Sequence, residues 1–215
     1  MRYRYIIFDL DNTLYPKESG LLDQVDQQID QYIGLKLKIP ATKIPGLRRE
    51  YWKKYGTTLG GMVACHQIDP DEYINYTYNV KVTDFLKPDP LLAQVLSGLK
   101  MKKVVFSNSP LNYVEEVLNV LQIRDFFEKV YDIRFCDYLG KPNLSSYYKV
   151  LVDLKAEGRE CLFIDDTPVN ILGGEAAGID SILLGNTTID GIKWKTSGLM
   201  ELPSLITEIQ GELTA

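Results

Sequence analysis

The feature of this 215-residue chain that most constrains its fold is an alternation of short apolar runs with helical patterns. The apolar runs are Tyr5–Asp9, Lys103–Asn108, Lys129–Ile133, Cys161–Asp166 and Ser181–Gly185. Between them, apolar side chains recur at helical spacing, as at Val114, Val117, Leu118 and Leu121. Strands that alternate with helices predict an α/β fold, in which a parallel sheet carries helices on both faces.

One long insertion interrupts this alternation, between the first and the second apolar run. A stripe from Val25 to Ile33 has helical spacing, and further helices are expected around Leu47–Tyr55 and Asp71–Asn79. The segment "YGTTLGG" is expected to be the loop between these last two helices, and no part of the insertion has the pattern of a strand. Because the insertion is too long for a simple connection, we expect a helical cap domain over residues 16–86, inserted into a discontinuous core of residues 1–15 and 87–215.

Composition disfavours several classes of function. The formal net charge is −5, which disfavours a broad nucleic-acid-binding surface. No apolar stretch reaches membrane-spanning length and the first residues lack a signal-peptide core, so we expect a cytoplasmic protein with no membrane partner. Cys65, Cys136 and Cys161 lack the spacing of a zinc site and are expected to be reduced thiols.

Polar side chains gather where the predicted strands end. They are Asp9 and Asp11 after the first run, Ser107 and Asn108 after the second, Asp165 and Asp166 after the fourth, and Lys141 just before a helix. Singly, each has a common structural explanation as a turn residue, a loop residue or a helix cap. Because the carboxyl ends of parallel strands meet at one edge of the sheet, where ligands bind, the full set indicates a site.

The spacing of the first two aspartates indicates the chemistry of that site. Asp9 and Asp11 lie at the end of a buried run, where two carboxylates repel each other and lose solvation. They persist together only if a positive group is near or one of them carries a proton. Phosphoryl transfer to a carboxylate needs this set, because a divalent cation must lie between an anionic ester and an anionic nucleophile. Oxygen ligands favour Mg²⁺ as that cation.

Each polar residue then has a predicted role. Asp9 attacks phosphorus to form an aspartyl phosphate, and Asp11 protonates the departing alkoxide and later takes a proton from water. Lys141 and the Ser107 hydroxyl hold the phosphoryl oxygens. Asp166 binds the metal, and it is supported there by Asp165 or Asn170.

Four motifs resemble the signatures of the haloacid dehalogenase (HAD)-type phosphatases, in the same order and over nearly the whole chain. They are "DLDNT", "FSNS", "GKP" and "FIDDTPVN". The resemblance implies a Rossmann-like core with a helical cap between the first two motifs, and a small-molecule phosphomonoester as substrate. It also implies that Asp9, Asp11 and Asp166 hold magnesium, Asp11 through its backbone carbonyl. Asn108, beside the motif hydroxyl of Ser107, is a candidate substrate contact.

The insertion resembles a narrower group, the pyrimidine 5′-nucleotidase-like branch of yeast and plants. The stretches that carry this resemblance are "DNTLYP", "YWKKYGTTLGGM", "DPDEY", "LKPDP" and "FCDY". The group hydrolyses nucleoside monophosphates, with UMP and CMP as typical substrates. In the predicted loop, Tyr55, Thr58 and Gly60 are therefore candidate contacts to the base, because they combine a flat ring, a hydroxyl and a permissive backbone.

Other functions remain open from the residues alone. A phosphatase or mutase acting on a sugar phosphate uses the same core motifs. A dehalogenase has less need of Asp11, because a halide leaves without a proton. A non-catalytic phospholigand-binding protein is expected to lose Asp9 or Asp11, and both are present. A monomer and a homodimer are equally compatible with the sequence.

Overall fold

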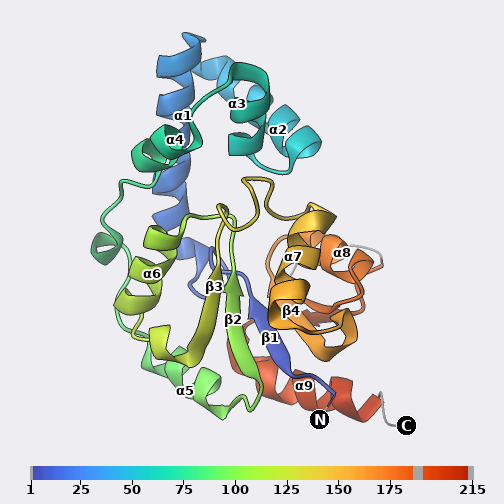
Figure 1. Ribbon diagram of the computed structural model, residues 1–215. Coiled ribbons are helices and arrows are strands. Elements are labelled where there is room, and N and C mark those ends of the chain that lie inside the picture. Colours follow the sequence, from blue (N-terminus) through green and yellow to red (C-terminus); the bar gives the residue numbers. More distant parts are fainter. Residues whose placement is uncertain (1, 186–190, 213–215) are drawn as a thin grey trace.

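The computed structural model describes residues 2–185 and 191–212, and its centre is a six-stranded parallel sheet (Figure 1). The strands are β1 (Tyr5–Phe8), β2 (Lys102–Phe106), β3 (Phe127–Tyr131), β4 (Cys161–Asp165), β5 (Asp180–Leu184) and β6 (Trp194–Thr196). Their order is β3-β2-β1-β4-β5-β6, and each neighbouring pair is parallel. This α/β architecture confirms the predicted fold class.

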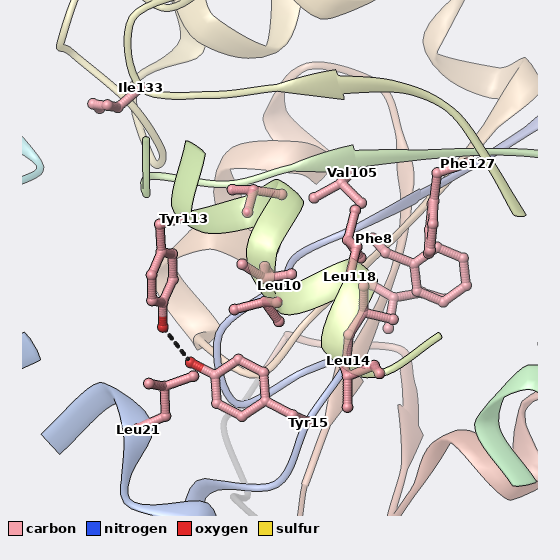
Figure 2. Close-up of a cluster of buried hydrophobic side chains, with 14 of the residues drawn as sticks. Phe8, Leu10, Leu14, Tyr15, Leu21, Val105, Tyr113, Leu118, Phe127 and Ile133 are labelled. Atoms are coloured by element: carbon pink, nitrogen blue, oxygen red, sulfur yellow. Dashed lines mark hydrogen bonds between the residues drawn. The ribbon is translucent and has the colours of Figure 1, made fainter. Parts of the chain in front are cut away.

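Strand periodicity explains how helices cover both faces of the sheet. Ile6 and Phe8 are buried in one apolar cluster with α5 (Pro90–Gly98), α6 (Leu111–Val120) and α9 (Leu202–Glu212). Ile7 is buried in a second cluster with α7 (Leu144–Leu154) and α8 (Pro168–Ala176). Successive side chains of a strand point to opposite faces, so β1 has to be apolar throughout. Figure 2 shows part of the first cluster, where the rings of Phe8 and Phe127 meet edge to face with centroids 5.9 Å apart.

The strand order creates a crevice at the carboxyl end of β1. The chain passes from β1 to β2 and β3 on one side, and it then returns to β4, β5 and β6 on the other. Tyr5 is accordingly level with Lys102 on one neighbour and Cys161 on the other. Such a reversal of strand order is the usual place for a ligand in an α/β sheet. Asp9 is the first residue after β1, and it lies at this point.

Four of the five α-helices between β1 and β2 in the sequence gather beyond one end of the sheet, at the top of Figure 1, and only α5 lies against the sheet itself. The four are α1 (Leu21–Leu37), α2 (Ile44–Tyr55), α3 (Thr58–His66) and α4 (Pro70–Thr77), and we call them the cap helices. One continuous apolar cluster runs from the sheet into α1, α2 and α4. The expected helices in this insertion are present, and residues 16–86 contain no strand. None of the helices among the described residues combines the length and hydropathy needed to cross a lipid bilayer.

The predicted loop in the insertion is wrong, because most of "YGTTLGG" belongs to the helix α3. Only Gly56 and Thr57 separate α2 from α3. The Thr57 hydroxyl accepts a hydrogen bond from the Gly60 amide at 2.9 Å and so caps the helix, which offsets the weak helix propensity of two glycines. At Gly61 a Cβ atom would lie 2.2 Å from the Tyr51 ring. The glycines therefore allow α3 to pack closely against α2.

This close packing generates a prediction about stability. Gly61→Ala should lower the free energy of unfolding by about 1–3 kcal/mol, because an added methyl group would overlap the inner atoms of the Tyr51 side chain. Gly98→Ala is the matched control: Gly98 is also helical, and no atom lies within 4 Å of its added Cβ. The control should leave stability unchanged or raise it by up to about 1 kcal/mol. Urea unfolding of both variants checks this, and equal stabilities would contradict the close α2–α3 contact.

Candidate active site

Sheet pairing brings the predicted acids together. The Asp9 amide donates to the Ile164 carbonyl at 2.9 Å, which fixes Asp9 to the end of β4. Asp165 is the last residue of β4, and Asp166 follows it. The acids that end β1 and β4 therefore meet because their strands are neighbours.

Lys141 lies at the centre of these acids, and it is only 1% exposed. Its Nζ atom is 2.6 Å from Asp9 Oδ1 and 2.7 Å from Asp165 Oδ2. Burial works against the ammonium charge, but the two carboxylates outweigh it and raise the pKa of Lys141. The rings of Phe106 and Phe163 also lie within 5.3 Å of Nζ and add a favourable cation–π contribution. Lys141 is therefore a buried cation that two acids hold in its charged form.

The backbone around Lys141 is held by Asn108. The Asn108 side chain donates to the Lys141 carbonyl at 2.9 Å and accepts from the Lys141 amide at 2.7 Å. The preceding residue, Gly140, has φ +62°, and a Cβ there would lie 2.5 Å from Asn108 Oδ1. Glycine therefore permits this paired contact. Asn108 was predicted as a substrate contact; it lines the cavity, and it also fixes the loop that carries Lys141.

Three carboxylates form a group that could hold a cation. Asp9, Asp165 and Asp166 each offer one oxygen, and these oxygens lie within 4.8 Å of one another. Asp165 already accepts from Lys141 on one oxygen and from the Thr167 amide on the other, at 2.8 Å. Its carboxylate also accepts from Asn170 Nδ2 at 3.1 Å. Asp165 is therefore the acid of this group whose oxygens are most fully occupied by protein donors.

Asp166 is the acid with more capacity for a metal. Among the described residues it accepts a side-chain hydrogen bond only from Thr167, at 3.1 Å. Burial, and then the charge of Asp9, raise the pKa of Asp166 to about 6. Repulsion of this kind is what a divalent cation would relieve. The donors are all hard oxygens, and Oδ1 of Asn170 is a buried acceptor with no partner among the described residues. The group therefore fits magnesium.

Asp11 has different neighbours. Its Oδ1 accepts from the Tyr15 hydroxyl at 2.5 Å and from the Tyr113 hydroxyl at 3.0 Å, and its Oδ2 accepts from the Ser109 hydroxyl at 2.6 Å. Burial is the largest influence on its pKa and the charge of Asp9 is the next, and both raise it. The Asp11 carboxylate does not belong to the acidic group. Two neighbouring acids of one loop thus have separate surroundings, which is typical of acids with separate roles.

A cavity of about 220 Å³ lies over these residues. It is lined on the core side by Asp9, Asp11, Lys141 and Asp166. On the other side it is lined by residues of the cap helices, among them Asp26, Arg48, Trp52 and Thr58, and by Tyr78, which follows α4. The cavity is smaller than the roughly 300–1,000 Å³ of most small-molecule sites. It therefore leaves room for a phosphoryl group and a compact remainder.

Several residues predicted to contact the substrate do not line this cavity. Ser107 is buried and is not among the cavity-lining residues; its hydroxyl accepts from the Ser109 amide at 3.0 Å. Tyr55 ends α2 outside the lining, with its hydroxyl 3.2 Å from Cys65 Sγ. Gly60 also lies outside the lining, whereas Thr58 is part of it.

The family described as haloacid dehalogenase-like hydrolases matches residues 3–178 of the chain. The chain belongs to this family of hydrolases. A haloacid dehalogenase-like hydrolase of known structure, the L-2-haloacid dehalogenase of Xanthobacter autotrophicus, has a TM-score of 0.63 at 14% identity, covering 95% of this chain and 98% of that one. For the HAD-hydrolase YfnB of Bacillus subtilis, in a structure bound to magnesium, the TM-score is 0.59 at 15% identity, with coverage of 96% and 99%.

The chain is also similar in sequence to a yeast protein. Phosphate metabolism protein 8 of Saccharomyces cerevisiae is 28% identical over 146 residues, which is 63% of this chain. The matched segment spans 44% of the yeast protein, so this HAD-like hydrolase corresponds to less than half of that relative's length.

The buried cation of this HAD-like hydrolase generates a second prediction. Lys141→Met should lower the free energy of unfolding by about 3–5 kcal/mol at neutral pH, measured in chelator, because it leaves Asp9 and Asp165 buried without a cation. The matched control is Lys149→Met, whose partner Asp137 is exposed, and it should cost less than about 1 kcal/mol.

The pH dependence gives a further check on the Lys141→Met variant. Burial already raises the pKa of Asp165, and loss of Lys141 removes an interaction that lowers it. An acid with a raised pKa binds its proton more readily in the folded than in the unfolded chain, so falling pH favours the fold. The stability deficit of Lys141→Met should therefore narrow between neutral and mildly acidic pH. A deficit that widens would contradict the buried ion pairs.

Proposed function

We propose that this hydrolase is a magnesium-dependent phosphomonoesterase that acts through an aspartyl phosphate. The observation that carries the proposal is the position of Lys141, which is buried against Asp9 and Asp165 beside a separate acid, Asp11. An anionic substrate next to a carboxylate nucleophile requires such fixed positive charge. The name of the yeast relative, a phosphate metabolism protein, also supports a phosphoryl substrate.

The residues divide the reaction into two steps. The Asp9 carboxylate forms a bond to phosphorus while the bond from phosphorus to the alcohol oxygen breaks, and Asp11 gives its proton to that oxygen. Asp11 then takes a proton from the water that attacks phosphorus, which releases phosphate and restores Asp9. Lys141 stabilises the negative charge of the phosphoryl oxygens. Magnesium, held by Asp9, Asp166 and the Asp11 carbonyl, would screen the substrate charge from the nucleophile.

The structure gives different support to the residues predicted beside the metal and to the hydroxyl predicted at the phosphoryl group. Asp165 and Asn170 support the metal site, because Asn170 donates to Asp165 and so holds it beside Asp166. Ser107 remains the predicted hydroxyl ligand of the phosphoryl group, although Ser109 is the serine of this loop that lines the cavity.

A dehalogenase function has less support. The dehalogenase of Xanthobacter autotrophicus shares the fold at 14% identity, and this likeness extends to the fold alone. A halide ion leaves without a proton, so a dehalogenase has no use for a second acid that three hydroxyl groups hold at the cavity. Asp11 therefore favours an oxygen leaving group, which requires protonation.

For the leaving group we propose a pyrimidine nucleoside monophosphate. The cavity is too small for a whole nucleotide, but it shares Asp26, Arg48, Trp52 and Thr58 with an adjoining outer groove between α1 and α2. Trp52 is 45% exposed and offers a flat face on which a base could stack. Asp26 and Arg48 are ion-paired and present an acceptor beside a donor, which complements the edge of a pyrimidine. Trp52 would thus have the role predicted for Tyr55.

A compact sugar phosphate is the second candidate substrate. The cavity volume of about 220 Å³ favours it, because a small polar leaving group would be enclosed without use of the outer groove. A sugar-phosphate mutase would share these contacts.

The third prediction tests the phosphatase reaction itself. Protein freed of metal by chelation should be inactive on p-nitrophenyl phosphate and should regain activity with Mg²⁺. Asp9→Asn should lower kcat about 1,000-fold or more while the fold is kept, because the amide is not a nucleophile. Asp153→Asn removes an acid whose contacts are on Lys129 and Tyr131, and this control should leave activity unchanged. Full turnover without metal, or phosphate trapped on a residue other than Asp9, would refute the reaction.

The fourth prediction tests the nucleotide proposal. Trp52→Ala should lower kcat/KM for UMP about 10-fold, through loss of base stacking, and should change p-nitrophenyl phosphate turnover less than about 2-fold. Tyr55→Phe is the matched aromatic control on the same helix, and it should leave kcat/KM unchanged for both UMP and p-nitrophenyl phosphate. If sugar phosphates have a higher kcat/KM than every nucleotide, or if Trp52→Ala affects both substrate types equally, the nucleotide assignment is wrong.

A further inference from the structure

Four hydroxyl groups surround Asp11, and the reaction as written uses none of them. They belong to Tyr15, Tyr78, Ser109 and Tyr113, which we call the Asp11 hydroxyl cluster. Tyr15, Tyr113 and Ser109 bond the carboxylate directly, as described above. The Tyr15 and Tyr113 oxygens are also 3.0 Å apart, and the Tyr78 oxygen is 3.3 Å from the Ser109 hydroxyl. Figure 2 draws the contact between Tyr15 and Tyr113 as a dashed line.

The members of the cluster come from four parts of the chain. Tyr15 follows β1, Ser109 follows β2, and Tyr113 is on α6. Tyr78 directly follows α4, the last of the cap helices, and it also lines the cavity. The rings of Tyr78 and Tyr113 meet edge to face at 5.1 Å. The cluster therefore connects Asp11 both to the core and to the segment that covers the cavity.

The contacts fix both oxygens of the Asp11 carboxylate. Oδ1 is held by two phenols and Oδ2 by a serine hydroxyl, so rotation of the carboxyl group would break at least one hydrogen bond. Burial, and then the charge of Asp11, raise the pKa of Tyr15 and of Tyr113 well above the ordinary value, so both phenols keep their protons. Orientation of this kind matters for a group that transfers a proton to one particular oxygen.

The arrangement suits a residue that changes protonation state during each turnover. When Asp11 is charged, Tyr15 and Tyr113 can both donate to Oδ1. When Asp11 carries a proton on Oδ2, which accepts from Ser109 alone, both phenols can still donate to Oδ1 and the proton stays available to the leaving oxygen. The cluster can thus hold the carboxyl group in the same place in both states.

We propose that Tyr15, Tyr113 and Ser109 are positioning residues that aim Asp11 at the leaving oxygen, and that Tyr78 links this arrangement to the cap helices. The proposal rests on the proposed function, in which Asp11 carries the proton. An aryl oxygen such as that of p-nitrophenol leaves without a proton, whereas the oxygen of an alkyl phosphate or a nucleotide needs one. Loss of positioning should therefore affect the two leaving groups unequally, which a general loss of packing would not do.

The test uses single-oxygen deletions in the magnesium-loaded full chain. Tyr15→Phe, Tyr113→Phe and Ser109→Ala should each lower kcat/KM for an alkyl phosphate at least about 10-fold and for p-nitrophenyl phosphate less than about 3-fold. The measured quantity is kcat/KM, because it reports the step in which the leaving group departs. Tyr78→Phe removes the longer contact and should have the same selectivity with a smaller loss.

Controls separate positioning from folding and from the role of Asp11. Tyr131→Phe removes the hydroxyl of a buried tyrosine that donates to Asp153, and it should leave kcat/KM unchanged for both substrates. Melting temperatures identify any variant that is unstable, and Ser109→Ala then remains as the mildest change. Asp11→Asn is measured in parallel and should show the same selectivity more strongly.

The outcomes are distinct. Suppose that Asp11→Asn lowers kcat/KM for the alkyl phosphate more than for p-nitrophenyl phosphate. If Tyr15→Phe, Tyr113→Phe and Ser109→Ala then change kcat/KM equally for the two substrates, or for neither, the positioning proposal is wrong and the proposed phosphatase reaction stands. If Asp11→Asn lowers kcat/KM equally for both substrates, Asp11 is not the acid–base residue, and the positioning inference is then also wrong. Selective loss in the direct variants supports the proposal, and selectivity in Tyr78→Phe supports the link to the cap helices.

Discussion

The site depends on one buried ammonium group. An unpaired charge at the position of Lys141 would be strongly destabilising, so the fold requires Asp9 and Asp165 to reach it from two neighbouring strands. That requirement is satisfied only if β1 and β4 are adjacent and end at the same level, as they do in the sheet. Asn108 and Gly140 then fix the loop from which Lys141 enters. Strand order, loop geometry and site charge are thus one connected constraint.

The same constraint separates the roles of the acids. Lys141 donates to Asp9 and Asp165, whereas Asp166 has no cationic partner among the described residues and accepts only one side-chain hydrogen bond. The remaining negative charge is what a divalent cation would neutralise before an anionic ester could approach. Asp11, two residues from Asp9, is held apart from this group by neutral hydroxyls. Different neighbours therefore give similar carboxylates different chemistry.

The sequence predicts those parts of the fold and site whose pattern lies within one short stretch of the chain. Buried strands such as β1 are apolar throughout, and their shared edge predicted that Asp9, Asp165 and Lys141 would meet. The three-residue strand β6 was missed, because so short a segment has no detectable period. The helix α3 was missed because its glycines suggested a loop, although they serve its contact with α2. Tyr113 lies far from Asp11 along the chain, so only the folded structure brings the two together.

The predicted loop is also the reason why Tyr55 is a candidate contact to the base. A flexible loop would have left that ring free to cover a base, but α3 places Cys65 beside the Tyr55 hydroxyl. Recognition of the leaving group is therefore proposed for the facing sides of α1 and α2, where Arg48 joins Asp26 and Asp30. A leaving group that displaces α4 would withdraw Tyr78 from Ser109, but it would leave Tyr15 and Tyr113, which come from the core, on Asp11. The proposed proton carrier should thus stay aimed while the cap helices adapt to the substrate.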